Sequence, residues 1–167
     1  IDWSPDGKRI AFSFYYQDNG KEDSNIFTIS PEGGEAVRLT KIEEDGLDCL
    51  SPRWSPDGRR IVFSDDVGRI WIVDSEGGEP QAITEKSGSV AWSARWSPDG
   101  KNIIFSRKEG ENWVCYSVPS QGGELQKLNL EAMNPDISPD GKKFVYSKIM
   151  KRIDQYWLLE NFLPERK

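Results

Sequence analysis

Four aspartates recur at one position of a repeated motif, and repeated carboxylates are candidates for metal binding or acid–base chemistry. The motif is Trp-Ser-Pro-Asp-Gly in three copies and Ile-Ser-Pro-Asp-Gly in the fourth. The aspartates are Asp6, Asp57, Asp99 and Asp140. Pro presets φ at the first central position of a turn, Asp accepts hydrogen bonds from nearby backbone N–H groups, and Gly adopts the positive φ that closes a hairpin. The motif therefore favours a structural turn over a repeated catalytic or metal site.

The residue types needed for several common kinds of catalysis are missing. The chain of 167 residues contains no His, which excludes Ser-His-Asp and Cys-His catalysis, the usual zinc chemistry and histidine-based pH switching within this sequence. Its two cysteines, Cys49 and Cys115, form no close-spaced metal pair and fit buried or free thiols, although the sequence leaves a disulfide between them open. We therefore expect no metal, no cofactor and no enzymatic activity in this chain.

The charge and hydropathy of the chain exclude two classes of partner. The formal net charge is −6, and no stretch combines Lys and Arg with interleaved aromatic residues, as nucleic-acid binding requires. No apolar run approaches the ~20 residues that span a bilayer, and no signal peptide opens the sequence. We expect a soluble chain that neither binds nucleic acid nor inserts into a membrane.

The motif copies mark a structural repeat, because similar apolar runs follow each of them. Each motif is followed by a basic residue and an apolar β run, then by a polar loop and a second apolar run. In the first three repeats a Gly-Gly pair then leads into a short last strand. Four strands in ~40–45 residues are typical of one β-propeller blade. The sequence therefore predicts an all-β propeller of four-stranded antiparallel blades, at about residues 1–42, 43–86, 87–130 and 131–167.

The combined pattern resembles a known family. Trp-Ser-Pro-Asp-Gly-Lys/Arg, followed by Ile-x-Phe-Ser, Gly-Gly and Leu-Thr, is similar to the repeat of TolB-like β-propellers and covers essentially the whole chain. The resemblance implies a six-bladed ring when intact, and a bacterial protein of the periplasm or cell envelope. Similar repeats occur in the propellers that cap prolyl-oligopeptidase-type peptidases and in sensory regions of bacterial regulators. Residues 154–162 resemble the C-terminal end of propellers found behind such regulatory domains.

Both ends of the repeat array are incomplete in sequence. The first repeat begins two residues before its motif, and the last has no Gly-Gly turn and no outer strand. We therefore expect residues upstream of Ile1 in the natural protein. Four of six blades would leave sheet edges and an apolar blade face exposed, so either the sequence is a fragment or partner chains cover the ends.

Charged residues recur just before the motif, on the strand nearest the propeller axis. Arg53 and Arg95 hold equivalent positions in the second and third repeats, and Asp2 and Asp136 hold this position in the first and last. These four side chains are predicted to ring the mouth of the central channel. They either pair with one another, as structural ion pairs do, or bind a peptide, a partner protein or a small anion.

The loops on one side of the propeller supply the other candidates. Blade-linking loops share a side with the loops between the second and third strands of each blade, and we expect binding there. Trp92 lies in a blade-linking loop and is either an interface anchor or a cover for the neighbouring blade. The acidic cluster Glu43–Asp48 ends in the candidate binding residue Asp48 and could attract a cation, but it lacks EF-hand spacing and fits a solvated loop.

These observations favour a non-catalytic module that binds or senses a protein, peptide or small ligand. The alternatives are a propeller that gates a prolyl-oligopeptidase-like peptidase, and a structural propeller that assembles with copies of itself. The peptidase alternative requires a hydrolase domain with Gly-x-Ser-x-Gly, Asp and His, and this chain has neither that motif nor any His.

Overall fold

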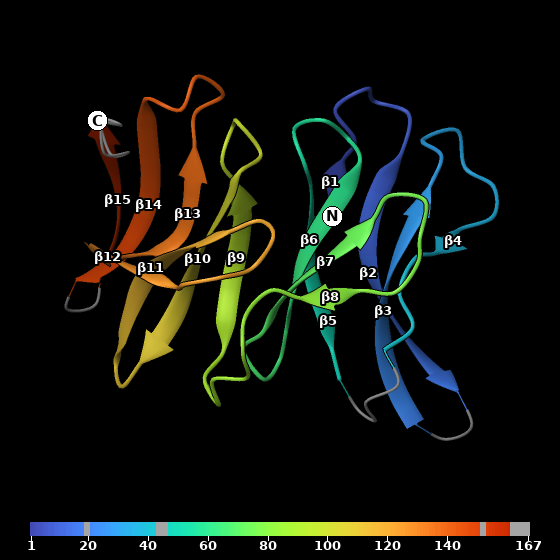
Figure 1. The fold of residues 1–167 in the computed structure, drawn as a ribbon, viewed down its shortest axis with the longest axis horizontal. Helices are drawn as coiled ribbons and strands as arrows, with labels where there is room; N and C mark the ends of the chain where they lie inside the picture. The colour runs from blue at the N-terminus through green and yellow to red at the C-terminus, as the bar shows by residue number, and fades with distance from the viewer. Residues whose placement is uncertain (19–20, 43–46, 151–152, 161–167) are drawn as a thin grey trace.

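The computed structural model describes residues 1–18, 21–42, 47–150 and 153–160. Every regular element in these residues is a β-strand, and the strands form four antiparallel sheets (Figure 1). The sheets, here called blades 1 to 4, follow one another along the longest axis of the molecule in chain order. No helix in the described part of the chain is long and apolar enough to cross a membrane. The predicted all-β propeller architecture with four blades is confirmed.

Each blade is a run of consecutive antiparallel strands. Blade 1 comprises β1 (Asp2–Trp3), β2 (Ile10–Asp18), β3 (Lys21–Ile29) and β4 (Val37–Arg38). Blade 2 comprises β5 (Cys49–Trp54), β6 (Arg60–Asp65), β7 (Ile70–Asp74) and β8 (Gln81–Ala82). Blade 3 comprises β9 (Ala91–Trp96), β10 (Asn102–Glu109), β11 (Asn112–Pro119) and β12 (Gln126–Glu131). Blade 4 comprises, in the described residues, β13 (Met133–Ile137), β14 (Lys143–Met150) and β15 (Ile153–Glu160).

The Ser-Pro-Asp-Gly segments form the same hydrogen-bonded turn in every blade. In blade 2 the Ser55 hydroxyl donates to Asp57 Oδ1 (2.6 Å), which also accepts the Arg59 N–H (3.0 Å), and Gly58 has a φ of 70°. Equivalent bonds are present in the other three blades. The bond from Ser55, followed by that from Arg59, lowers the pKa of Asp57 because both stabilise the ionised carboxylate. The turn role predicted for the repeated aspartates is confirmed.

Blades 2 and 3 each present an aromatic face to the aliphatic face of the blade before. Phe63 on β6 stacks on Trp71 on β7, with ring centroids 6.3 Å apart. This pair packs against Ala11 and Ile26 of blade 1 in one buried cluster. Phe105 of blade 3 packs in the same way against blade 2. Because both faces of an inner blade are buried, the strand runs are almost continuously apolar.

Arginines that follow the turns join neighbouring blades at the inner-strand tryptophans. The guanidinium group of Arg9 lies 4.8 Å from the ring centroid of Trp54, and that of Arg60 lies 4.7 Å from the ring of Trp96. Arg9 also donates a hydrogen bond to the Ser75 carbonyl at 2.8 Å. Each cation–π contact therefore links one blade to the next.

The two cysteines are separate, buried thiols, so no disulfide joins them. Burial raises the pKa of the Cys115 thiol to about 11, and the hydrogen bond with Ser106 acts in the opposite direction. Cys115 packs in the core of blades 3 and 4, and the raised pKa disfavours the reactive thiolate form.

Candidate functional site

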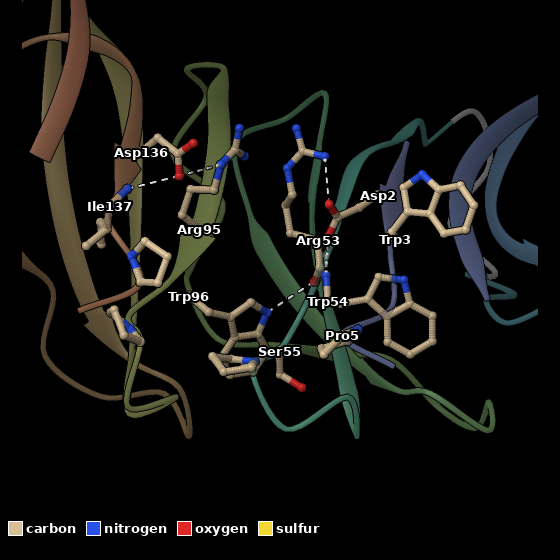
Figure 2. Close-up of a pocket in the computed structure, with 13 residues that line it drawn as sticks. Asp2, Trp3, Pro5, Arg53, Trp54, Ser55, Arg95, Trp96, Asp136 and Ile137 are labelled. Atoms are coloured by element: carbon tan, nitrogen blue, oxygen red, sulfur yellow. Dashed lines mark hydrogen bonds and ion pairs between the residues drawn. The ribbon is translucent and has the colours of Figure 1, made fainter. Parts of the chain in front are cut away.

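The innermost strands of the four blades lie side by side and form the wall of one open pocket. β1 contacts β5, β5 contacts β9, and β9 contacts β13. The pocket is lined by the residue before each motif and by motif residues themselves (Figure 2). The charged lining residues, one from each blade, are Asp2, Arg53, Arg95 and Asp136. We call this site the inner-strand pocket.

A β-bulge precedes the charged residue in blades 2, 3 and 4. The register between the first and second strands of each of these blades shifts at this place. At each bulge a residue other than glycine has a positive φ, namely 53° at Ser51, 58° at Ser93 and 49° at Asn134. The left-handed conformation costs such residues of order 1–3 kcal/mol each. Bulges redirect the side chains that follow them, here the charged residue two positions later.

The sequence prediction missed these three bulge residues. The available signal was a small polar residue three positions before each motif, in the second, third and fourth repeats. Ser93 and Asn134 also join blades 3 and 4, because the Ser93 hydroxyl donates to Asn134 Oδ1 at 2.7 Å. The bulges are therefore part of the wall of the pocket region and not isolated defects.

The four charged side chains form two ion pairs, each between neighbouring blades. Arg53 Nη1 lies 3.6 Å from Asp2 Oδ1, and Arg95 Nε lies 3.7 Å from Asp136 Oδ1 (Figure 2). Each carboxylate also accepts a backbone N–H, from Trp54 at 2.8 Å for Asp2 and from the following residue at 2.9 Å for Asp136. The predicted pairing of these residues is confirmed, and their binding of a ligand or partner stays a prediction.

The two arginines occupy the middle of this arrangement. Figure 2 shows both guanidinium groups at one level, with a carboxylate on the outer side of each. The side chain of Arg95 is 19% exposed and that of Arg53 is 26% exposed. Burial, and then the charge of Arg53, lower the pKa of Arg95, whereas Asp136 and Asp2 raise it. Arginine stays protonated in proteins, so the pocket holds two like charges side by side.

Trp92 and Asp48 do not line the inner-strand pocket. Both lie where their inner strands begin, at the end opposite the Ser-Pro-Asp-Gly turns. Trp92 is 45% exposed and packs at a tilt against Trp113 of its own blade, with ring centroids 5.3 Å apart and 35° between the ring planes. The Asp48 N–H donates to Asp66 Oδ1 at 3.4 Å. Residues 43–46 of the acidic cluster lie outside the described residues.

The pocket lies toward the Ser-Pro-Asp-Gly turns, whereas we expected binding on the opposite side of the propeller. Its lining includes one proline from each Ser-Pro-Asp-Gly turn, whereas the expected side carries the blade-linking loops. The lining prolines are Pro5, Pro56, Pro98 and Pro139. The physical reason is that the charged residue stands one position before the motif, so it belongs to the turn end of the inner strand.

A fully buried acid on the opposite side of blade 2 has a structural role. Asp65 Oδ2 accepts hydrogen bonds from Arg69 Nε at 2.6 Å and from Trp71 Nε1 at 2.8 Å. Its Oδ1 accepts the backbone N–H groups of Val67 and Arg69. Both oxygens are thus satisfied by the surrounding turn. In the described ranges, no group of three or more His, Cys, Asp or Glu could hold a metal ion.

Comparison with solved structures supports the fold. TolB from Acinetobacter baumannii has a TM-score of 0.70 to this chain at 24% sequence identity. The match covers 95% of this chain and 39% of that TolB chain. At this identity the likeness establishes the architecture alone.

Two curated relatives are similar to this chain over short stretches, and one family model matches nearly the whole chain. The uncharacterized peptidase YuxL of Bacillus subtilis is 37% identical over 89 residues, which are 50% of this chain and 13% of YuxL. The Tol-Pal system protein TolB of Nitratidesulfovibrio vulgaris is 34% identical over 50 residues, which are 30% of this chain and 11% of that protein. The model of the TolB beta propeller domain matches residues 2–157, in which the four motif copies lie, and the chain therefore belongs to this family.

Proposed function

We propose that the chain is a non-catalytic module that binds a protein or peptide segment at the inner-strand pocket. The observation that carries this proposal is the convergence of one charged side chain from each of four blades on a single open pocket. The lining also includes Trp3, which is 54% exposed. Tryptophan and arginine are the residue types enriched at binding hot spots.

Two further observations support binding over catalysis. The hydroxyl group among the lining residues belongs to Ser55, which is bonded to Asp57 and to the Arg60 N–H inside its turn. Among the described lining residues no nucleophile is therefore paired with a base, as covalent catalysis requires. The TolB relative is named as a Tol-Pal system protein, which supports a protein partner for this chain as well.

Selection of peptides on the immobilised chain tests this proposal. A peptide library with free C-termini is expected to give peptides that bind the wild-type chain. These peptides should bind the Arg53→Ala/Arg95→Ala double variant at least about tenfold more weakly, as expected for hot-spot residues. Arg59→Ala is the matched control, because it removes an exposed arginine outside the pocket. Equal binding to the wild type and the double variant would exclude this pocket as the site.

As a second candidate function, the chain forms part of the propeller domain of a peptidase. The 37% identity with the Bacillus subtilis peptidase over half of this chain favours it. The reading frame on both sides of this segment decides the matter. An in-frame Gly-x-Ser-x-Gly segment followed by Asp and His supports the peptidase, and a frame without them rejects it.

Assembly with copies of the same chain is the remaining proposal. The internal junctions pair an aromatic face with an aliphatic face. Among the residues that the structure describes, Phe14 on the aromatic face of blade 1 is 53% exposed and Val145 of blade 4 is 40% exposed, so each of these two faces is open there. Light scattering at increasing concentration should then give a rising mass. A monomer mass throughout would reject this assembly.

A further inference from the structure

We infer that the group recognised in the inner-strand pocket is a carboxylate, held between the guanidinium groups of Arg53 and Arg95. The inference rests on the proposed function, because it names the chemistry of the ligand at that same pocket. The carboxylate is either the C-terminus of the bound segment or an acidic side chain, and both present the same planar pair of oxygens to the arginines.

The two guanidinium groups have donors that no described residue of the chain accepts. A guanidinium group carries five N–H donors in a planar fork. Within the part of the chain that the structure describes, Arg53 donates hydrogen bonds from Nη1, to the carbonyls of Ile1 at 2.6 Å and Pro52 at 3.5 Å. Arg95 donates from its own Nη1, to the Ala94 carbonyl at 3.1 Å. The Nη2 donors of both arginines are therefore available to a ligand.

The internal ion pairs are too long to saturate the arginines. Charge-assisted N–H···O bonds measure about 2.7–2.9 Å and are often bidentate when arginine meets a carboxylate. The pairs with Asp2 and Asp136 measure 3.6 Å and 3.7 Å. A ligand carboxylate between the two arginines can accept from both forks while the aspartates keep their places on the outer sides (Figure 2).

The arrangement of charges selects a singly charged anion. Arg53 and Arg95 are partly desolvated and repel one another, and a carboxylate between them replaces this repulsion with two attractions. The aspartates on the outer sides make the set of four neutral in sum. A dianion such as phosphate would therefore be repelled more strongly by Asp2 and Asp136 than a singly charged anion. A cation would be repelled by the two arginines. The set thus fits a carboxylate better than either.

The arginines are held in place before a ligand arrives. Each follows a bulge with a left-handed residue, Ser51 in blade 2 and Ser93 in blade 3. Strained backbone next to a pocket is typical of positions fixed for binding. Donors that are already ordered lose little conformational entropy when the ligand binds. The backbone therefore prepares the site that the two side chains complete.

Titration of small carboxylates into the whole chain tests the inference. The readout is the NMR signals of the arginine Nε–H groups and the tryptophan indole N–H groups. N-acetylglycine presents a C-terminal carboxylate, the α-amide of N-acetylaspartate presents a side-chain carboxylate, and N-acetylglycinamide is the neutral control. At least one carboxylate should shift the signals of Arg53 and Arg95 saturably, and the neutral amide should not. The carboxylate that binds more tightly identifies the source.

Variants extend the test to the named residues. Arg53→Gln and Arg95→Gln are each expected to weaken binding about tenfold or more, because each removes hydrogen bonds to a charged group. Arg59→Gln is the matched control and should leave binding unchanged. The inference is overturned if the neutral amide binds as well as N-acetylglycine, if neither carboxylate shifts the pocket signals, or if inorganic phosphate binds more tightly than both. The comparison of acid and amide on the wild type holds even if a substitution disturbs folding.

The outcomes also separate this inference from the proposed function. If the library yields peptides that require Arg53 and Arg95 but bind equally well when amidated and free of acidic residues, the pocket binds peptides and the carboxylate inference is wrong. If small carboxylates bind but no peptide does, the carboxylate site stands and the protein-binding function is wrong.

Discussion

The aromatic faces of blades 1 and 2 are built alike and have opposite surroundings. Phe12 and Phe27 stack in blade 1 with ring centroids 5.9 Å apart, as Phe63 and Trp71 do in blade 2 at 6.3 Å. The blade 2 pair packs against aliphatic side chains of blade 1, and Phe63 is fully buried. Within the described residues the blade 1 pair lines an open pocket together with the exposed Phe14. The open face of blade 1 therefore has the chemistry of a blade junction without its covering blade.

The two faces differ at one equivalent position on their second strands. Blade 1 has Phe14 there, which packs edge-on against Phe27, and blade 2 has Asp65. The buried Asp65 is tolerated because Arg69 and Trp71 donate hydrogen bonds to it. Phe14 brings no polar group to its face. A covered face can therefore hold a charge when that charge is fully hydrogen-bonded, as Asp65 is, whereas the open face places the apolar Phe14 at this position and has Arg38 at its edge.

Truncation of the equivalent phenylalanines gives the largest contrast between the two faces. Phe63→Ala is expected to lower the free energy of unfolding by about 3–5 kcal/mol, because it leaves a cavity in a buried cluster. Phe12→Ala removes a ring that is open on one side, and a loss of about 1 kcal/mol is expected. Urea unfolding followed by tryptophan fluorescence measures both. Equal losses would contradict the contrast, since they would mean that Phe12 is as well covered as Phe63.

Repetition is what made the fold and the charged part of the pocket predictable. The motif aligns equivalent positions of neighbouring blades, so Arg53, Arg95 and Asp136 could be expected on adjacent inner strands, and they do line one pocket. The bulges were harder to predict, because the repeated small polar residue, Ser51 or Ser93, does not itself require a left-handed conformation, which arises from the pairing of whole strands.

Residues outside the repeat were harder to place. Trp92 could be assigned to the blade-linking end of its blade, but its neighbour depends on the side-chain packing that brings it onto Trp113. The neighbours of Asp48 were equally hard to predict, because they include Asp66 in the next turn and Ser24 of blade 1. Such contacts have no characteristic sequence spacing, whereas the position of both residues at the start of their inner strands is what keeps them away from the pocket.

A smaller effect is expected where arginines bridge the blades. Arg60 lies over Trp96 at the junction of blades 2 and 3, whereas Asn102 and Ile137 hold the two equivalent positions at the next junction. Arg60→Ala should lower the free energy of unfolding by about 1–2 kcal/mol, because it removes the cation–π contact and the packing of its stem. Asn102→Ala is the matched change and should stay within about 0.5 kcal/mol. A loss at Asn102 as large as that at Arg60 would show that the bridge does not distinguish the junctions.

Substitutions in the Ser-Pro-Asp-Gly turns, which are alike in blades 1 and 2, are expected to have the smallest effect on stability. The serine hydroxyl, and then the backbone N–H two residues after the aspartate, lower the pKa of Asp6 and of Asp57. A carboxyl with a lower pKa in the folded state takes up its proton first in the unfolded state as the pH falls. The stability it contributes is therefore present above the ordinary carboxyl pKa of about 3.9 and is lost as the pH falls through the lowered folded value.

The variants Asp57→Asn and Asp6→Asn test whether the turns of blades 1 and 2 contribute equally to the pH dependence of stability. Because Asn does not titrate, each variant should lose less stability than the wild type between about pH 5 and pH 3, as measured by urea unfolding across that range. Both aspartates are exposed, at the ends of the strands and away from the blade faces, so the two variants should flatten the pH profile to a similar extent. If only Asp57→Asn flattened the pH profile, the turn of blade 2 would contribute more to stability than the turn of blade 1. The two blades would then differ at their turns as well as at their aromatic faces.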